Sequence, residues 1–76
     1  MLVQVNIIQD EDGMWCAAGV GDADGLHTQG RRLEELFANI EEATQLHFAE
    51  DLEAGKTIDV LITAQKELVG ASTAGG

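Results

Sequence analysis

Hydrophobic and polar residues alternate along two stretches of the chain, and such alternation is typical of β-strands. Between Leu2 and Gln9 the apolar residues Val3, Val5 and Ile7 are separated by polar neighbours. Thr57 to Ala64 alternates in the same way and predicts another strand. Between these two, Met14 to Val20 and Leu26 to Gln29 are expected as the second and third strands.

Turn-forming residues separate the first three of these strands. The sequence DEDG, Asp10 to Gly13, ends on an Asp-Gly pair, which tolerates the positive φ angles of a tight hairpin. The glycine- and aspartate-rich sequence GDADG, Gly21 to Gly25, predicts a loop before the third strand, which ends at Gly30. The first three strands are therefore expected to be connected by short turns.

From Arg32 the apolar residues recur every three or four positions, which predicts an amphipathic helix. Gly55 suits the position just past the end of that helix. The apolar stripe would consist of Leu33, Leu36, Phe37, Ile40, Ala43, Thr44 and His47, and the opposite side would carry Glu34, Glu35, Glu41, Glu42 and Glu53.

The element order βββαβ predicts an α+β fold. An antiparallel three-stranded meander would be followed by one helix and a fourth strand parallel to the first or third strand. One helix covers one face of a sheet, yet three of the strands carry apolar residues at both parities. We expect the second face to be buried against another copy or another protein. The 76 residues predict a single domain over residues 1–69 and a flexible tail over residues 70–76.

The chain is strongly acidic. Four Lys and Arg stand against fourteen Asp and Glu, so the net charge is −10. Binding to DNA or to an anionic membrane surface is disfavoured, because both depend on Lys and Arg. A basic protein partner is favoured, since opposite potentials steer association. The alternative is that the charge serves solubility alone.

The acidic clusters and the single cysteine are weak candidates for chemistry. The carboxylates of residues 10–12, and those of Asp22 and Asp24, lack the ligand spacing of a calcium loop, and turn chemistry explains both clusters. Cys16 is the only cysteine, so an internal disulfide and a cysteine metal cluster are excluded. We expect it to be a small buried hydrophobe in a strand. No signature for nucleophilic catalysis joins Cys16 to His27 and Asp24. We therefore expect no catalytic, cofactor-binding or metal-binding residue.

The only basic pair, Arg31 and Arg32, stands at the start of the predicted helix. The helix dipole disfavours cations there, and capping positions usually carry Ser, Thr or Asp. This placement suggests pairing with Glu34, Glu35 or the acidic groups of a partner; solvated arginines are the alternative.

Two stretches, DEDGMWCA (Asp10 to Ala17) and GLHTQGRRLEELFANIEEATQL (Gly25 to Leu46), resemble the HicB family of bacterial antitoxins in order and spacing. The resemblance implies a partial ribonuclease-H-like fold without catalysis, since fold does not imply function. It also implies that the chain masks a small basic RNA-cleaving toxin, which would be HicA-like. The matching residues are Trp15, Ala17, Gly25, Thr28, Gly30, Leu33, Glu34, Glu35, Asn39, Ile40, Glu42 and Ala43.

The chain departs from the family pattern at three places. The sequence GDADG replaces a proline-containing loop, and Arg32 replaces the usual cap residue. After Ala64 only QKELVGASTAGG follows, where typical members add a DNA-binding segment. The resemblance is thus to a shortened, stand-alone member, and no DNA binding is expected.

Three functions follow as hypotheses. The first is an antitoxin-like protein-binding module in the bacterial cytoplasm, where a lone cysteine stays reduced. The second is a self-associating homologue, a dimer or a higher even-numbered oligomer, with an unknown partner or ligand. The third is a metal-dependent hydrolase. The residues expected to contact a partner are Glu34, Glu35, Glu41, Glu42, Arg31 and Arg32.

Overall fold

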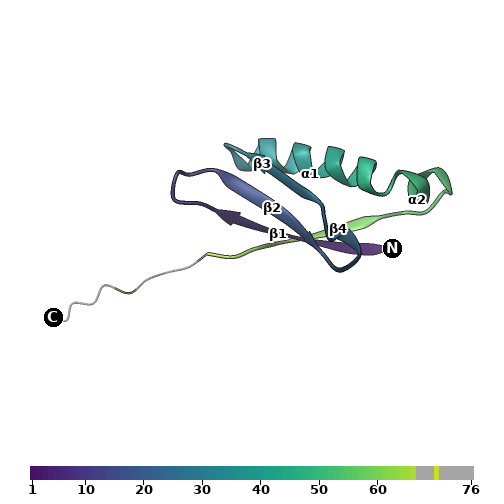
Figure 1. The fold of residues 1–76 in the computed structure, drawn as a ribbon, viewed down its shortest axis with the longest axis horizontal. Helices are drawn as coiled ribbons and strands as arrows, with labels where there is room; N and C mark the ends of the chain where they lie inside the picture. The colour runs from purple at the N-terminus through teal and green to yellow at the C-terminus, as the bar shows by residue number, and fades with distance from the viewer. Residues whose placement is uncertain (67–69, 71–76) are drawn as a thin grey trace.

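A four-stranded mixed sheet with one main helix on one of its faces forms an α+β fold (Figure 1). The computed structural model describes residues 1–66 and residue 70. The expected boundary between a domain at 1–69 and a tail at 70–76 falls, apart from Gly70, outside the described residues. That division of the chain stays a prediction.

All four predicted strands are present, and their order in the sheet is β3-β2-β1-β4. β1 pairs antiparallel with β2, and β2 pairs antiparallel with β3. β4 pairs parallel with β1, which is one of the two positions expected for it. The strands are β1 (Leu2–Gln9), β2 (Trp15–Val20), β3 (His27–Gly30) and β4 (Asp59–Ala64).

Three of the expected strands begin one or two residues too early. Met14 and Leu26 precede β2 and β3, and residues 57–58 precede β4. Leu26 is nevertheless buried, and its amide donates a hydrogen bond to the carbonyl of Ala23 at 3.0 Å. It was assigned to a strand because it is apolar, but it serves the core from a turn.

The hairpin between β1 and β2 is confirmed. One carboxylate oxygen of Asp10 accepts hydrogen bonds from the backbone N–H groups of Asp12 and Met14, each at 2.9 Å. Gly13 has a φ of 87°, which a residue with a side chain rarely adopts. The carboxylate of Asp10 is therefore used to build the turn.

The expected plain loop at Gly21 to Gly25 contains a short 3₁₀ turn, η1 (Gly21–Ala23). Ala23 is fully buried against β1 and β2. A Cβ atom at Gly19 would lie 2.0 Å from the carbonyl oxygen of Ala23. Glycine at position 19 therefore allows η1 to fold back onto β2.

The prediction of a single helix that runs up to Gly55 is wrong, because the helix is interrupted at Phe48. The structure has α1 (Leu33–His47) and a short α2 (Ala49–Glu53), separated at Phe48. Phe48 leaves helical geometry, with φ −113° and ψ 30°, and its side chain is buried with Val3 and Ala23. Burial of this ring bends the chain back over the end of the sheet. Gly55 follows α2 with a φ of 82°, as expected of a residue past a helix end.

Two contacts fix α1 over β3 and β2. A Cβ atom at Gly30 would lie 2.7 Å from the backbone nitrogen of Leu36, so the end of β3 and the first turn of α1 touch through backbone. The side-chain amide of Asn39 donates a hydrogen bond to the carbonyl of Gln29 at 2.8 Å. The helix is thereby held on the β3 side of the sheet, away from β4.

This position of α1 corrects the expected apolar stripe. Leu36, Ile40 and Thr44 are buried as expected, but Leu33 and Phe37 are 40% and 45% exposed, and His47 is also exposed. The buried arc of the helix is narrow because the helix contacts mainly β3 and β2. Phe37 consequently faces the less covered side, towards β4.

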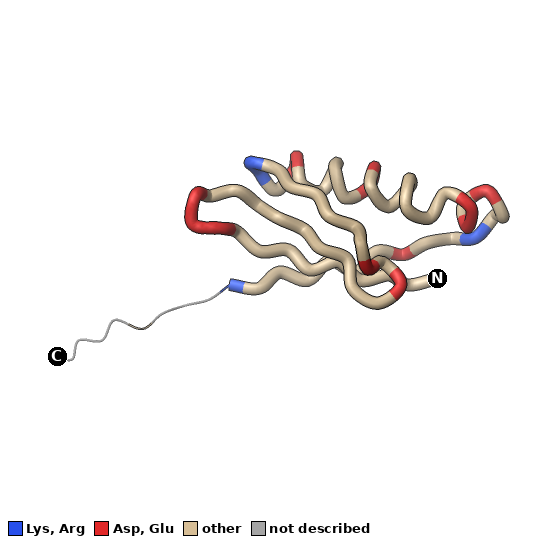
Figure 2. Tube along the Cα trace, in the orientation of Figure 1, with Lys and Arg blue, Asp and Glu red and all other residues tan. Residues whose placement is uncertain are grey.

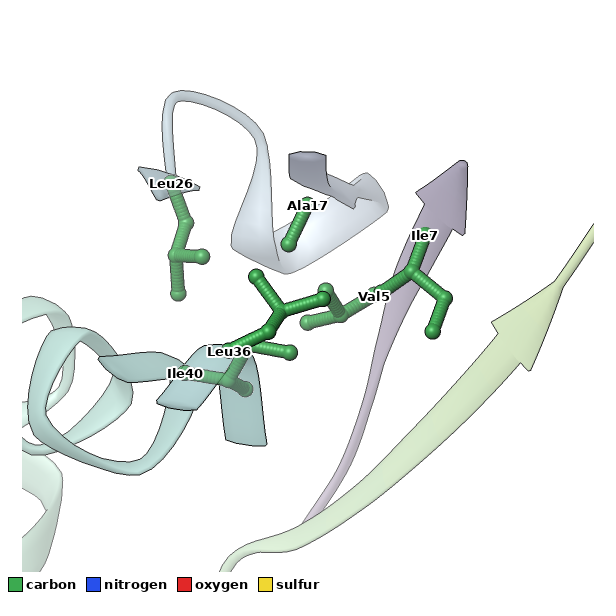
Figure 3. Close-up of a cluster of buried hydrophobic side chains, with 6 residues drawn as sticks. All are labelled: Val5, Ile7, Ala17, Leu26, Leu36 and Ile40. Carbon is green, nitrogen blue, oxygen red and sulfur yellow. The ribbon is translucent and has the colours of Figure 1, made fainter. Parts of the chain in front are cut away.

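The main hydrophobic core lies between α1 and the sheet. Leu36 and Ile40 point from the helix towards Val5 and Ala17 of the sheet (Figure 3). Leu36 and Val5 have no exposed surface, and burying such a side chain stabilises the fold by about 1.5–3 kcal/mol. Trp15 is half-buried at the margin of this cluster.

Candidate protein-binding surface

The four glutamates expected to contact a partner are exposed along α1. Glu34 and Glu35 lie in its first turn, where negative charge is favourable to the helix dipole. Glu41 and Glu42 lie two turns further along. Among the described residues the one ion pair joins Lys56 Nζ to Asp51 Oδ1, at 3.1 Å. All four glutamates therefore carry charge that no described cation offsets by direct contact.

The structure divides these glutamates into two sets. Neighbouring helix residues point about 100° apart, so Glu41 and Glu42 face different directions. Glu41 lines a groove between α1 and β4, and Glu42 does not. Glu34, seven residues before Glu41, lies on the same side of the helix as Glu41. The acidic patch expected as one surface is therefore two surfaces, of which one borders an apolar groove.

The groove itself was not expected from the sequence. It has a volume of about 350 Å³ and exists because α1 packs over β3 and β2, leaving the β4 side of the sheet less covered. Phe37 stands exposed at its edge, and Leu52 of α2 is also partly exposed there. The groove is lined by Phe37, Ile40, Glu41, Thr44, Gln45, Leu52, Ile58, Val60 and Ile62. A surface of this composition can hold apolar side chains of a partner beside a carboxylate.

The two arginines stand apart from this groove. Arg32 is the residue that precedes α1, with extended backbone and no side-chain cap hydrogen bond. Arg31 borders a shallow hollow with Asp12 and the β1–β2 turn. The expected pairing with Glu34 or Glu35 is not present among the described residues, where neither arginine has an ion pair. Both arginines are exposed.

Acidic residues otherwise gather in the connections between elements (Figure 2). They lie in the β1–β2 turn, in the η1 connection and around α2. The described basic residues lie before α1, in the connection between α2 and β4, and after β4. A basic partner would thus meet negative potential from several directions, and the α1–β4 groove adds an apolar surface to it.

The uncovered face of the sheet is more polar than the sequence pattern suggests. The exposed apolar side chains expected there are present: Leu2, Ile8, Val20 and Leu61. Between them, however, Asn6 Oδ1 accepts hydrogen bonds from Gln4 Nε2, at 3.1 Å, and from Thr63 Oγ1. These polar side chains lie on β1 and β4, among the exposed apolar residues of the face.

Cys16 and His27 lie on this same uncovered face and line a shallow hollow of about 740 Å³. Cys16 is half-buried, so the expectation of a buried hydrophobe is only partly met. Its position on β2 turns the side chain away from the core. Asp24 is not among the residues that line the hollow.

Within residues 1–66 and 70, no three His, Cys, Asp or Glu side chains come together in a way that could hold a metal ion. No helix of that part of the chain is long and apolar enough to cross a membrane.

The sequence contains a weak indication of the apolar residues that line the groove. Phe37 lies beside the buried arc of a helix that already carries Leu36 and Ile40, and β4 has apolar residues on both parities. This excess of apolar surface was attributed to the uncovered sheet face, although part of it belongs to the groove. Comparison with protein-family models, with characterised proteins and with solved structures gives no match to this chain.

Proposed function

We propose that this chain is an antitoxin-like binding module that masks a small basic RNA-cleaving protein. The observation that carries the proposal is the α1–β4 groove, in which an apolar floor adjoins Glu41 in a chain of net charge −10. Apolar contacts slow the dissociation of a complex, and complementary charge raises its association rate and its specificity. The groove supplies both kinds of contact at one place.

The finer fold and family assignments belong to the same proposal. An element order of three strands, a helix and a fourth strand parallel to β1 is compatible with a partial ribonuclease-H-like fold of the HicB type. The resemblance in sequence to HicB antitoxins supports a HicA-like toxin as the partner. The proposed role is binding in the bacterial cytoplasm, without a catalytic residue, a cofactor or DNA as a ligand.

The test uses a small basic protein encoded beside this chain in its genome. The two proteins are purified separately, and RNA cleavage by the basic protein is followed as this chain is titrated into the assay. We expect cleavage to stop near an equimolar ratio, because a masked active site is unavailable to RNA. Undiminished cleavage at a large excess of this chain, or the lack of any such neighbour, would contradict the proposal.

A second candidate function is self-association, with an unknown partner or ligand. It is favoured by the exposed Leu2, Ile8, Val20 and Leu61 on the uncovered sheet face. Two copies related by a two-fold axis would cover these residues, which predicts a dimer or a higher even-numbered oligomer. Light scattering at micromolar concentration measures the molar mass. A monomer at that concentration would remove this candidate.

A further inference from the structure

Within residues 1–66 and 70, the outer edge of β4 has backbone hydrogen-bonding groups that no other strand pairs with. The amide of Asp59 donates to the carbonyl of Met1 at 2.8 Å, and the amide of Gln65 donates to the carbonyl of Ile7 at 3.2 Å. Odd-numbered residues therefore turn their amides towards β1. Because backbone groups alternate in direction along a strand, those of residues 60, 62 and 64 point to the outer edge. No described strand pairs with β4 on that side.

This edge lacks the usual protection against strand pairing. Sheets commonly guard their edges with Lys, Pro, bulges or very short strands. β3, at the other edge, has four residues, whereas β4 has six and contains no Lys or Pro. Leu61 is exposed on β4, and Val60 and Ile62 are half-buried along the groove. An extended segment placed beside β4 would thus find both backbone partners and apolar contacts.

Charge decides which segment fits. Glu41 borders the groove, Glu34 lies on the same side of α1, and Asp59 is exposed at the start of β4. None of the residues that line the groove is Lys or Arg. Lys56, close in sequence to β4, is engaged with Asp51. A second copy of this chain also has a net charge of −10 and would be repelled. A basic segment would be attracted.

We propose that an extended segment of the basic partner pairs with the free edge of β4 as a fifth strand. Alternate apolar side chains of that segment enter the α1–β4 groove beside Phe37, and its basic side chains point to the opposite face of the sheet, where Asp59 is exposed. Glu41 attracts the segment as it approaches the groove. Main-chain hydrogen bonds supply affinity in this mode of recognition, and the groove supplies selectivity. This inference rests on the proposed function, because it names how the proposed basic partner is held.

The probe is a short synthetic peptide in which valine and lysine alternate, added to the isotope-labelled full chain. Nuclear magnetic resonance is expected to show shifts concentrated at the amides of Val60, Ile62 and Ala64, with slower hydrogen exchange there. The same peptide N-methylated on the bonding side is expected to bind about tenfold more weakly, or worse, because it cannot donate to β4. Equal binding of both peptides would show attraction by charge alone and would overturn the inference.

A matched pair of variants locates the groove. Phe37→Ser is expected to weaken binding of the valine–lysine peptide about tenfold. Leu46→Ser removes a side chain that is 74% exposed on the β3 side of the same helix, and it should leave binding unchanged. Thermal melts check that both variants fold. The comparison with the N-methylated peptide uses the unchanged chain, so it does not depend on the folding of a variant. Equal effects of the two variants would overturn the inference.

Two further outcomes count against this docking mode. Absence of peptide binding would overturn it. Concentration-dependent shifts at residues 60, 62 and 64 without peptide would show that a second copy occupies the edge. The proposed function is judged separately by RNA cleavage: if Phe37→Ser still blocks the toxin at an equimolar ratio, masking stands and uses another surface.

Discussion

Individual residues that carry the resemblance to HicB antitoxins have structural roles in this chain. Asn39 ties α1 to β3 through the carbonyl of Gln29, and Ile40 belongs to the core. Gly30 permits the contact of β3 with the start of α1. These residues explain the fold of the stretch from Gly25 to Ala43. The proposed function depends instead on residues beside them, of which Phe37 and Glu41 are the most direct.

The clearest energetic contrast at this scale lies within α1. Leu36→Ala and Ile40→Ala remove side chains that are almost completely buried, so each should lower the free energy of unfolding by about 2–5 kcal/mol. Leu46→Ala, on the same helix but largely exposed, should change it by less than about 0.5 kcal/mol. Denaturant unfolding of the three variants measures these values. A large cost at Leu46 would show that the buried arc of α1 is assigned wrongly.

At the scale of elements, the sequence predicted the strands well. Period-two alternation marks β1 and β4, and turn-forming residues separate β2 and β3 from their neighbours. The break at Phe48 was not visible, since the apolar periodicity of α1 continues through it. What ends α1 is the contact of Phe48 with Val3 and Ala23, which are far away in sequence. Tertiary burial of one ring overrides the local helical preference there.

The position of α1 on the sheet could not be predicted from the periodicity of its residues either. A stripe of seven residues predicts that a helix packs, but it does not predict over which strands. Gly30 and Asn39 decide this by holding α1 near β3. The groove beside β4 follows from that placement, and so does the presence of Glu41 rather than Glu42 in its lining. The acidity of the helix and the angle between neighbouring glutamates were therefore predictable, whereas the glutamate that borders the groove was not.

At the scale of the whole molecule, net charge is the dominant property. Charges of one sign keep copies apart and speed the encounter with an oppositely charged protein. From the sequence, this charge favours a basic protein partner, and solubility is the alternative. The structure adds a place where attraction can become a lasting complex, because the groove offers apolar contact and β4 offers backbone groups.

The most direct test of the central claim is the association rate of the proposed basic partner with Glu41→Lys and with Glu42→Lys. Both glutamates are exposed, and both variants change the charge equally, but only Glu41 lines the groove. With docking at the groove, Glu41→Lys should slow association about tenfold at low salt and Glu42→Lys much less. The difference should shrink as salt screens the charges. Equal slowing by both variants, or no slowing by either, would contradict docking at the α1–β4 groove.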